Sequence, residues 1–140
     1  MAIGIDGILE TALYVDDLEA AEAFYGGVLG LDVVIKQPER HVFFRCGPGM
    51  LLLFNADHSR IPAGPDMLPV PAHGAHGQGH ACFRMARANM DGMVAHLGKA
   101  GVAIEADFLW PNGARSIYFR DPAGNSLECA EARLWQIDED

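Results

Sequence analysis

Hydrophobic and polar residues alternate along residues 8–15, and the spacing then changes to that of a helix. The alternation in 8–15 (ILETALYV) predicts a β-strand. Asp16 and Asp17 can cap a helix, and apolar residues then recur every three or four positions up to Gly30, where the helix is expected to stop. A further strand is predicted at 33–35. The first part of the chain therefore has the order strand, helix, strand.

The same order returns in the second half of the chain. Residues 80–85 predict a strand, a helix follows a break at 88–89, and Gly101 stops that helix. The next strand is predicted to begin at 102–104. The sequence thus contains an internal repeat, and such repeats define the architecture of a chain.

Each half continues with a predicted hairpin. Residues 41–54 match residues 116–130 at a constant offset of 75, so that Phe44 corresponds to Phe119. Both hairpins are expected to have five residues between their strands, with a glycine at the fourth position for a turn with positive φ.

The repeat predicts an α+β fold within a single domain. It consists of two βαβββ modules whose strands form a curved mixed sheet, with the helices on the outer face and a cup inside. Module one covers about 5–56 and module two about 79–134. The segment 57–78 is rich in Gly, Pro, Ala and His and is predicted to be a linker loop.

The two faces of the predicted strands differ in polarity. One face is apolar, and we expect it to pack on the helices; it carries Leu13, Val15, Leu52, Phe54, Phe83, Met85, Leu127 and Cys129. The other face is polar and would line the cup; it carries Glu10, Tyr14, His80, Arg84, Ser126 and Glu128. Ionisable groups in such a cup need partners, and a metal ion is one such partner.

Composition narrows the range of partners. Half of the 140 residues are hydrophobic and 21% are charged, which is typical of a folded globular chain. The net charge of −9 argues against binding to nucleic acid or to an anionic membrane surface. No basic leader and no apolar run of about 20 residues is seen, so a cytoplasmic location is expected. The three cysteines are expected to be buried thiols.

Three residues of the cup form a candidate metal site. Glu10 and His80 begin corresponding strands of the two halves, and Glu128 lies on the last strand, where its counterpart in module one is Leu53. One imidazole and two carboxylates suit a single divalent ion, which can be Mn, Fe, Ni, Co or Zn. The alternative is that both carboxylates are solvated at strand ends and that His80 is an ordinary histidine.

Three segments resemble the vicinal-oxygen-chelate superfamily: DDLEAAEAFYGGVLGL, GHACF and YFRDPAGNSLE. That superfamily includes glyoxalase I, bleomycin-resistance proteins, fosfomycin-resistance enzymes and extradiol dioxygenases. The resemblance implies paired βαβββ modules and metal ligands on the first, fifth and last strands, which by position are Glu10, His80 and Glu128. The first of these is usually His or Gln in the family. The fourth ligand of glyoxalase I is a Glu, and Leu53 stands at the matching position.

Hairpin register suggests further residues of the cup. A five-residue loop places Tyr118 opposite Glu128 and Arg120 opposite Ser126, and in module one it places Arg45 opposite Leu51. Tyr118 is then either a donor to a metal-bound oxygen or a plain strand aromatic. The turn 110–115 is expected at the mouth of the cup. The predicted substrate-binding residues are Phe43, Arg45, Leu53, Arg84, Trp110, Arg115, Tyr118 and Arg120.

The histidine-rich segment 73–80 and the preceding residues 57–72 allow two interpretations. His73 and His76 stand between glycines, which favours an exposed flexible loop over a second metal site. A long loop of this kind can also act as a lid over a rigid scaffold.

The resemblance, taken together with these residues, implies a metal-dependent enzyme of the glyoxalase or dioxygenase type, acting on a small, oxygen-bearing and anionic substrate. Lyase or isomerase, epoxide-opening and dioxygenase chemistry all remain open. The alternative is a metal-free protein that sequesters a drug, as bleomycin-resistance proteins do. Open sheet edges further predict a homodimer.

Overall fold

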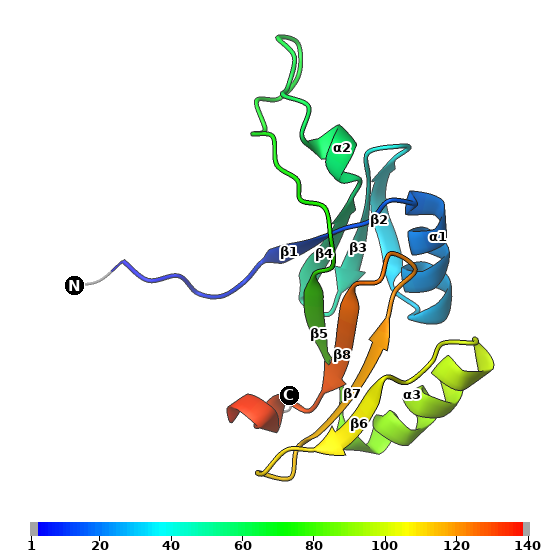
Figure 1. The fold of residues 1–140 in the computed structure, drawn as a ribbon. Coiled ribbons are helices and arrows are strands. Elements are labelled where there is room, and N and C mark those ends of the chain that lie inside the picture. Colours follow the sequence, from blue (N-terminus) through cyan, green and yellow to red (C-terminus); the bar gives the residue numbers. More distant parts are fainter. Residues whose placement is uncertain (1–2, 139–140) are drawn as a thin grey trace. The chain divides into compact units, whose positions relative to one another are not determined.

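The computed structural model describes residues 3–138, and the chain divides into two compact units between His76 and Gly77 (Figure 1). The first unit contains β1 (Glu10–Tyr14), α1 (Leu18–Glu22), the π-helical segment η1 (Ala23–Val28), β2 (Asp32–Gln37), β3 (His41–Cys46), β4 (Gly49–Phe54) and α2 (Ala56–Ser59). The second contains β5 (His80–Arg84), α3 (Arg87–Lys99), β6 (Ala106–Leu109), β7 (Arg115–Arg120), β8 (Ser126–Ala130) and the 3-10 turn η2 (Ala132–Trp135). We keep the terms module one and module two for these units.

The two modules have the same strand order. Module one is a four-stranded sheet ordered β1-β4-β3-β2, and module two is one ordered β5-β8-β7-β6. In each module the first and last strands pair in parallel, and the remaining neighbours are antiparallel. The predicted α+β fold of two βαβββ modules is confirmed.

Local signals place the helix ends close to their predicted positions. The Asp17 side chain accepts a hydrogen bond of 3.0 Å from the backbone N–H of Ala20, which satisfies one free donor of the first turn. Gly30 and Gly101 follow the two helices with φ of 74° and 78°, where a side chain would strain the backbone.

Two boundaries in module two differ from the prediction. Helix α3 begins at Arg87, before the expected break at 88–89. Residues 102–104 are not a strand, because the backbone N–H of Val102 turns back to the Leu97 carbonyl and closes the helix end. The next strand therefore starts only at Ala106.

The first hairpin is shorter than predicted. Cys46 pairs with Gly49, which leaves a two-residue loop, and Arg45 lies opposite Met50 rather than Leu51. The second hairpin follows the prediction, with Tyr118 opposite Glu128. The offset of 75 therefore holds up to β3 and fails by one residue in β4. Phe43 is the equivalent of Tyr118, which lies opposite Glu128. The counterpart of Glu128 in module one is therefore the residue opposite Phe43, which is Leu52 and not Leu53.

This one-residue difference reverses the faces of β4, because alternate side chains of a strand point to opposite sides. Leu51 and Leu53 share a face with Phe44, whose ring lies 5.9 Å from that of Tyr25 in η1. The predictions that Leu52 and Phe54 pack on the helices and that Leu53 lines the cup are therefore wrong. Leu53 is fully buried in the core. We call the side of each sheet away from its helices the open face.

The core of module two follows the predicted alternation. Leu127 and Cys129 of β8 point to the helix side together with Ile117 and Phe119 of β7, and all four are buried. Of the other two cysteines, Cys46 is half-buried and Cys82 is exposed, so the expectation of three buried thiols is wrong. Among the residues described, no helix is both long and apolar enough to span a membrane.

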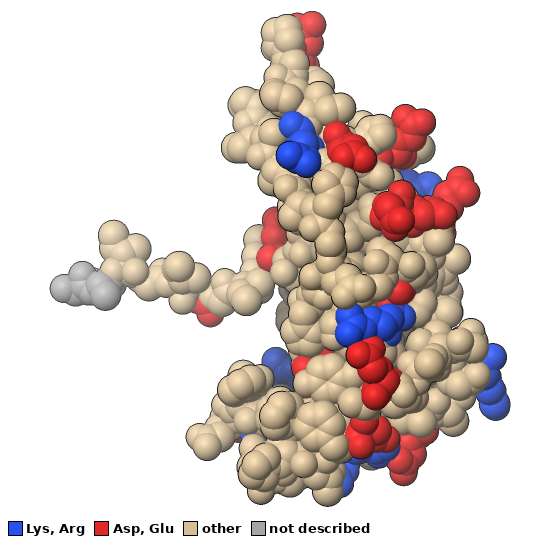
Figure 2. Space-filling view, viewed as in Figure 1, with Lys and Arg blue, Asp and Glu red and all other residues tan. Residues whose placement is uncertain are grey.

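Acidic side chains gather near the start of α1 on the face drawn in Figure 2. Asp16, Asp17 and Glu19 line a hollow there, together with Glu22 and Glu39. Part of the acidic excess of the chain is thus concentrated at this end of module one.

The register of β4 can be tested with two glutamate variants. Leu53→Glu should leave the chain largely unfolded, because it buries an unpaired carboxylate at a fully enclosed position. Leu52→Glu should fold, because its side chain reaches the open face. Urea unfolding followed by circular dichroism checks this. Equal loss of stability in both variants would contradict the register.

Candidate functional site

The carboxylate of Glu128 is the central group on the open face of module two. Glu128 lies on β8 and is only 5% exposed. Its Oε2 accepts a hydrogen bond of 2.6 Å from Ser116 Oγ, and its Oε1 lies 3.5 Å from Nε2 of His80. The two oxygens therefore have different surroundings, one facing the protein and one facing His80.

Nε2 of His80 is the ring nitrogen that faces Glu128. Its Nδ1 lies 2.9 Å from the backbone carbonyl of Ser126, which can only accept, so Nδ1 carries the proton of this bond. In the neutral ring Nε2 is then an acceptor. Two acceptors, Nε2 and Oε1, thus face one another, and this arrangement suits a cation between them.

Tyr118 and Cys82 are protonated neighbours of this carboxylate. Burial, and then the charge and hydrogen bonding of Glu128, raise the pKa of the Tyr118 hydroxyl to about 12. Burial, followed by the same carboxylate, raises the pKa of the Cys82 thiol to about 12. Both groups therefore keep their protons at neutral pH in the metal-free protein. The Tyr118 ring stacks near that of His80, with centroids 6.3 Å apart.

The structure brings together two of the three predicted metal ligands. His80 and Glu128 meet within module two, whereas Glu10 belongs to module one. Strand register confirms that Glu10 and His80 hold equivalent positions, since each begins the strand that pairs in parallel with the last strand of its module. Within residues 3–138, no group of three His, Cys, Asp or Glu side chains is arranged to hold a metal. The imidazole and carboxylate pair does fit the donor chemistry of a borderline divalent ion.

The open face of module one forms an apolar cavity of about 690 Å³. Phe43, Leu52 and Phe54 form its floor, and Glu10 lies among its lining residues. The loop that follows α2 also lines this cavity, with Ile61, Ala63, Met67, Leu68 and Val70. A cavity of this size and character is typical of a site for a small organic molecule.

Arg40 adds a cationic group to this cavity. Its guanidinium carbon lies 5.4 Å from the centre of the Phe54 ring, and its Nη1 lies 2.7 Å from Nδ1 of His41. Burial and the nearby Arg40 charge lower the pKa of His41, so His41 stays neutral and can accept this hydrogen bond. In the described part of the chain, Arg40 has no ion pair with a carboxylate.

The loop after α2 is held more firmly than the sequence suggested. His73 Nδ1 lies 2.7 Å from the Tyr14 hydroxyl, and its ring meets Phe54 edge to face at 4.5 Å. The carbonyl of His73 accepts a hydrogen bond of 2.6 Å from Ser59. His76 lies 2.9 Å from Asp57. His73 and His76 lie outside helices and strands, as expected, but these contacts hold the loop that was expected to be flexible.

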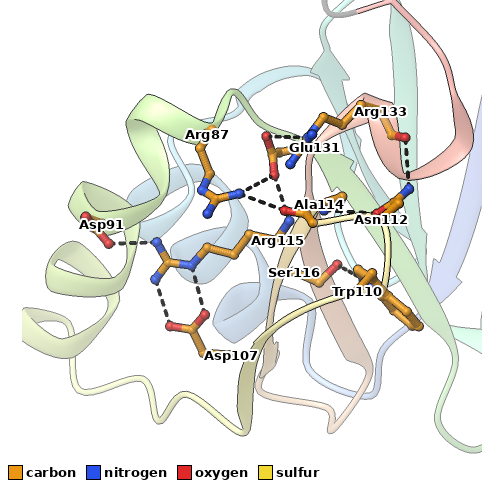
Figure 3. A network of polar contacts seen from close by, with 11 residues as sticks. Arg87, Asp91, Asp107, Trp110, Asn112, Ala114, Arg115, Ser116, Glu131 and Arg133 are labelled. Carbon is orange, nitrogen blue, oxygen red and sulfur yellow. Dashed lines mark hydrogen bonds and ion pairs between the residues drawn. The ribbon is translucent and has the colours of Figure 1, made fainter.

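Arg115 does not face the cup. It lies on the helix side of β7, where it forms two hydrogen bonds of 2.9 and 2.8 Å to Asp107 and one of 2.7 Å to Asp91 of α3 (Figure 3). The prediction that Arg115 binds substrate is wrong because its neighbour Ser116, one position along, takes the open face. Arg115 instead ties α3 to the sheet.

The other predicted arginines have varied surroundings. Arg120 is bound to Glu105 by hydrogen bonds of 2.6 and 2.9 Å, which neutralise its charge. Arg84 is exposed and donates to the Asp138 carbonyl over 3.4 Å. Arg45 is exposed on the open face of module one, opposite Met50.

Sequence reasoning missed Ser116 and Arg40. Ser116 stands two residues before Tyr118 on the same strand, so strand alternation could have assigned it to the same face. Trp110, predicted at the mouth of the cup, donates from Nε1 to Ser116 Oγ over 2.7 Å and so connects to Glu128 (Figure 3). Arg40 lies in the turn before β3, where no periodic pattern indicates its direction.

The fold is shared with solved structures of other proteins. A lactoylglutathione lyase from Agrobacterium tumefaciens is 47% identical, with a TM-score of 0.90, and the match covers 95% of this chain and 98% of that chain. A virulence protein from Salmonella typhimurium is 26% identical, with a TM-score of 0.68 over 92% of this chain and 98% of that one. A fosfomycin resistance protein from Mesorhizobium loti shares the fold at 22% identity, with a TM-score of 0.65 over 95% and 98% of the two chains.

No curated protein matches the chain. A sequence profile matches residues 7–129, a span that includes both modules as well as Glu10, His80 and Glu128. With the repeated βαβββ topology and this match, the chain belongs to the Glyoxalase/Bleomycin resistance protein/Dioxygenase superfamily.

Proposed function

We propose that this protein is a divalent-metal-dependent enzyme of the lactoylglutathione lyase type. Its substrate would be a small ketoaldehyde joined to a thiol such as glutathione. The observation that carries the proposal is the His80–Glu128 pair on a chain 47% identical to a lactoylglutathione lyase over nearly its whole length. His80 and Glu128 would hold the ion, with Glu10, the equivalent of His80 in module one, as third ligand. When bound, such an ion polarises substrate oxygens as a Lewis acid.

The chain's own carboxylates would carry out the proton transfer. Converting the hydroxy-ketone end of such a conjugate into a lactoyl thioester moves one proton from the sulfur-bearing carbon to the neighbouring carbonyl carbon. A second proton passes from the hydroxyl oxygen to the former carbonyl oxygen, and no oxidant or reductant is needed. Glu128 Oε1 and the Glu10 carboxylate are the candidate bases, since a base must reach the reacting carbon. Tyr118 keeps its proton at neutral pH and would donate a hydrogen bond to a substrate oxygen.

The cavity of module one would hold the organic part of the substrate. Its apolar floor, formed by Phe43, Leu52 and Phe54, suits a compact carbon body. Arg40 would bind a carboxylate of the substrate, because its guanidinium faces the cavity without an acidic partner among residues 3–138. Among the other predicted arginines, Arg45 and Arg84 remain candidates for such contacts.

The same cavity supports a second candidate function. An apolar, aromatic-lined space of about 690 Å³ can sequester a drug without any reaction. This candidate requires binding that is independent of metal, whereas the lyase proposal requires His80 and Glu128.

We further propose that the protein is a homodimer. Val33, Val34 and Ile35 are exposed on β2, which is the edge strand of module one. Ile3 and Ile5 of the N-terminal segment are almost fully exposed. Apolar side chains on an open sheet edge are a liability that pairing with a second copy removes.

The metal assignment predicts one ion per chain. Titration calorimetry of chelator-treated protein with Ni²⁺ and Zn²⁺ should show this stoichiometry. His80→Ala and Glu128→Gln should abolish it, and Glu10→Gln should weaken it. His96→Ala, which removes an exposed histidine from α3, is the matched control and should bind normally. Normal binding by His80→Ala would contradict the assignment.

The activity proposal predicts turnover of the glutathione conjugate of a three-carbon ketoaldehyde. Activity should be lost with chelator and with His80→Ala. Arg40→Gln should raise KM by about 10- to 100-fold, because hydrogen bonds to a charged group contribute about 1.5 to 3 kcal/mol. Arg60→Gln, an exposed arginine at the end of α2, should leave KM unchanged. Tight drug binding without turnover or metal would instead support sequestration.

The dimer proposal predicts a sedimentation mass of twice 15.1 kDa at micromolar concentration. Ile35→Glu should shift the protein toward the single-chain mass, because it places a charge on the exposed edge strand. A single-chain mass for the unchanged protein would refute the proposal.

A further inference from the structure

Two side chains behind Glu128 form a chain of hydrogen bonds that ends on its carboxylate. Trp110 Nε1 lies 2.7 Å from Ser116 Oγ, and Ser116 Oγ lies 2.6 Å from Glu128 Oε2. An indole N–H can only donate, so Ser116 accepts from Trp110. The single hydroxyl proton of Ser116 is therefore directed to Glu128. The direction of both bonds follows from the chemistry of the groups.

Burial makes this chain a strong constraint. Ser116 is fully buried and Glu128 is 5% exposed. Hydrogen bonds are stronger where water is excluded. When a buried acceptor loses its donor, the folded state is destabilised by the full desolvation free energy of that acceptor. Glu128 Oε2 is therefore held in its hydrogen bond with Ser116. Oε1 alone is left to face His80 Nε2.

Ser116 and Glu128 stand on the neighbouring strands β7 and β8, and Trp110 directly follows β6 of the same sheet. Ser116 on β7 pairs with Phe108 of β6 on one side and with Ala130 of β8 on the other. The indole of Trp110 is held in turn, since its ring packs edge to face on Phe108 at 4.9 Å. Its backbone N–H also donates to the Ala114 carbonyl over 2.8 Å. The donor to Ser116 is therefore fixed in place.

We propose that Ser116 and Trp110 are positioning residues that hold the Glu128 carboxylate so that a single oxygen, Oε1, is presented to a cation beside His80. This rests on the proposed function, in which His80 and Glu128 bind a divalent ion. Without the Ser116 donor, the carboxylate can rotate and present either oxygen. A carboxylate that is not held in its binding orientation binds an ion more weakly. Loss of a hydrogen-bond partner that orients a metal ligand typically lowers metal affinity by about 10- to 100-fold.

The test compares Ser116→Ala, Trp110→Phe and the double variant. The readouts are the Ni²⁺ dissociation constant, measured by competition with a chelator, and the urea midpoint of the metal-free protein. Ser116→Ala should weaken Ni²⁺ binding by about 10- to 100-fold. Trp110→Phe keeps an aromatic ring but removes the N–H, and should weaken binding less. Because Trp110 acts through Ser116, the double variant should bind no more weakly than Ser116→Ala.

Two matched variants separate positioning from general loss of stability. Ser59→Ala removes an equally buried serine, whose hydroxyl donates to the His73 carbonyl over 2.6 Å in module one. It should lower the urea midpoint without changing Ni²⁺ affinity. Trp135→Phe alters an indole that is 75% exposed and should change neither quantity.

Each outcome separates this inference from the proposed function. If the unchanged protein binds Ni²⁺ and Ser116→Ala binds it equally well, the positioning role is wrong and the metal proposal stands. If Ser116→Ala and Ser59→Ala lower affinity alike, the effect is structural and the inference is overturned. If the losses of affinity in the two single variants add up in the double variant, Trp110 does not act through Ser116, and its positioning role is wrong. If the unchanged protein binds no ion, the proposed function fails, and this inference fails with it.

Discussion

The pairing of the last two strands in each module determines which side chains face the helices and which face outward. Side chains alternate along a strand, so a change of one residue in the hairpin exchanges the two faces completely. In module two, a loop from Asp121 to Asn125 places Glu128 beside Tyr118 on the open face. In module one, the equivalent pair is Arg45 and Met50, and the connection between them is one residue shorter, which places Leu52 at the position equivalent to Glu128. The character of each open face depends on this register.

A nearly buried carboxylate is costly unless several donors compensate for the lost water. Glu128 meets this requirement through Ser116, while Tyr118 and Cys82 remain protonated beside it. Its second oxygen is left facing an imidazole nitrogen that is itself an acceptor in the neutral ring. In module two, one oxygen of this carboxylate accepts from Ser116 and the other faces His80.

The two modules share one topology but differ in the chemistry of their open faces. Module one presents Phe43, Leu52 and Phe54, with Arg40 as the cationic group. Module two presents His80 and Glu128. The duplicated scaffold therefore carries an apolar surface in one copy and a histidine–carboxylate pair in the other.

The sequence by itself determined the repeat, the two βαβββ modules and the equivalence of Glu10 with His80. These depend on local periodicity and on helix signals such as Asp17 and Gly30, which neighbouring residues decide. Only the tertiary structure decided the face of Leu53, because turn geometry sets the hairpin register and the loop length was not apparent from the repeat. The tertiary structure likewise decided the role of Arg115, because its carboxylate partners come from α3 and β6. It also decided the role of Trp110, because its indole N–H donates to Ser116. Contacts of this kind depend on how separate elements pack, and no spacing along the chain contains them.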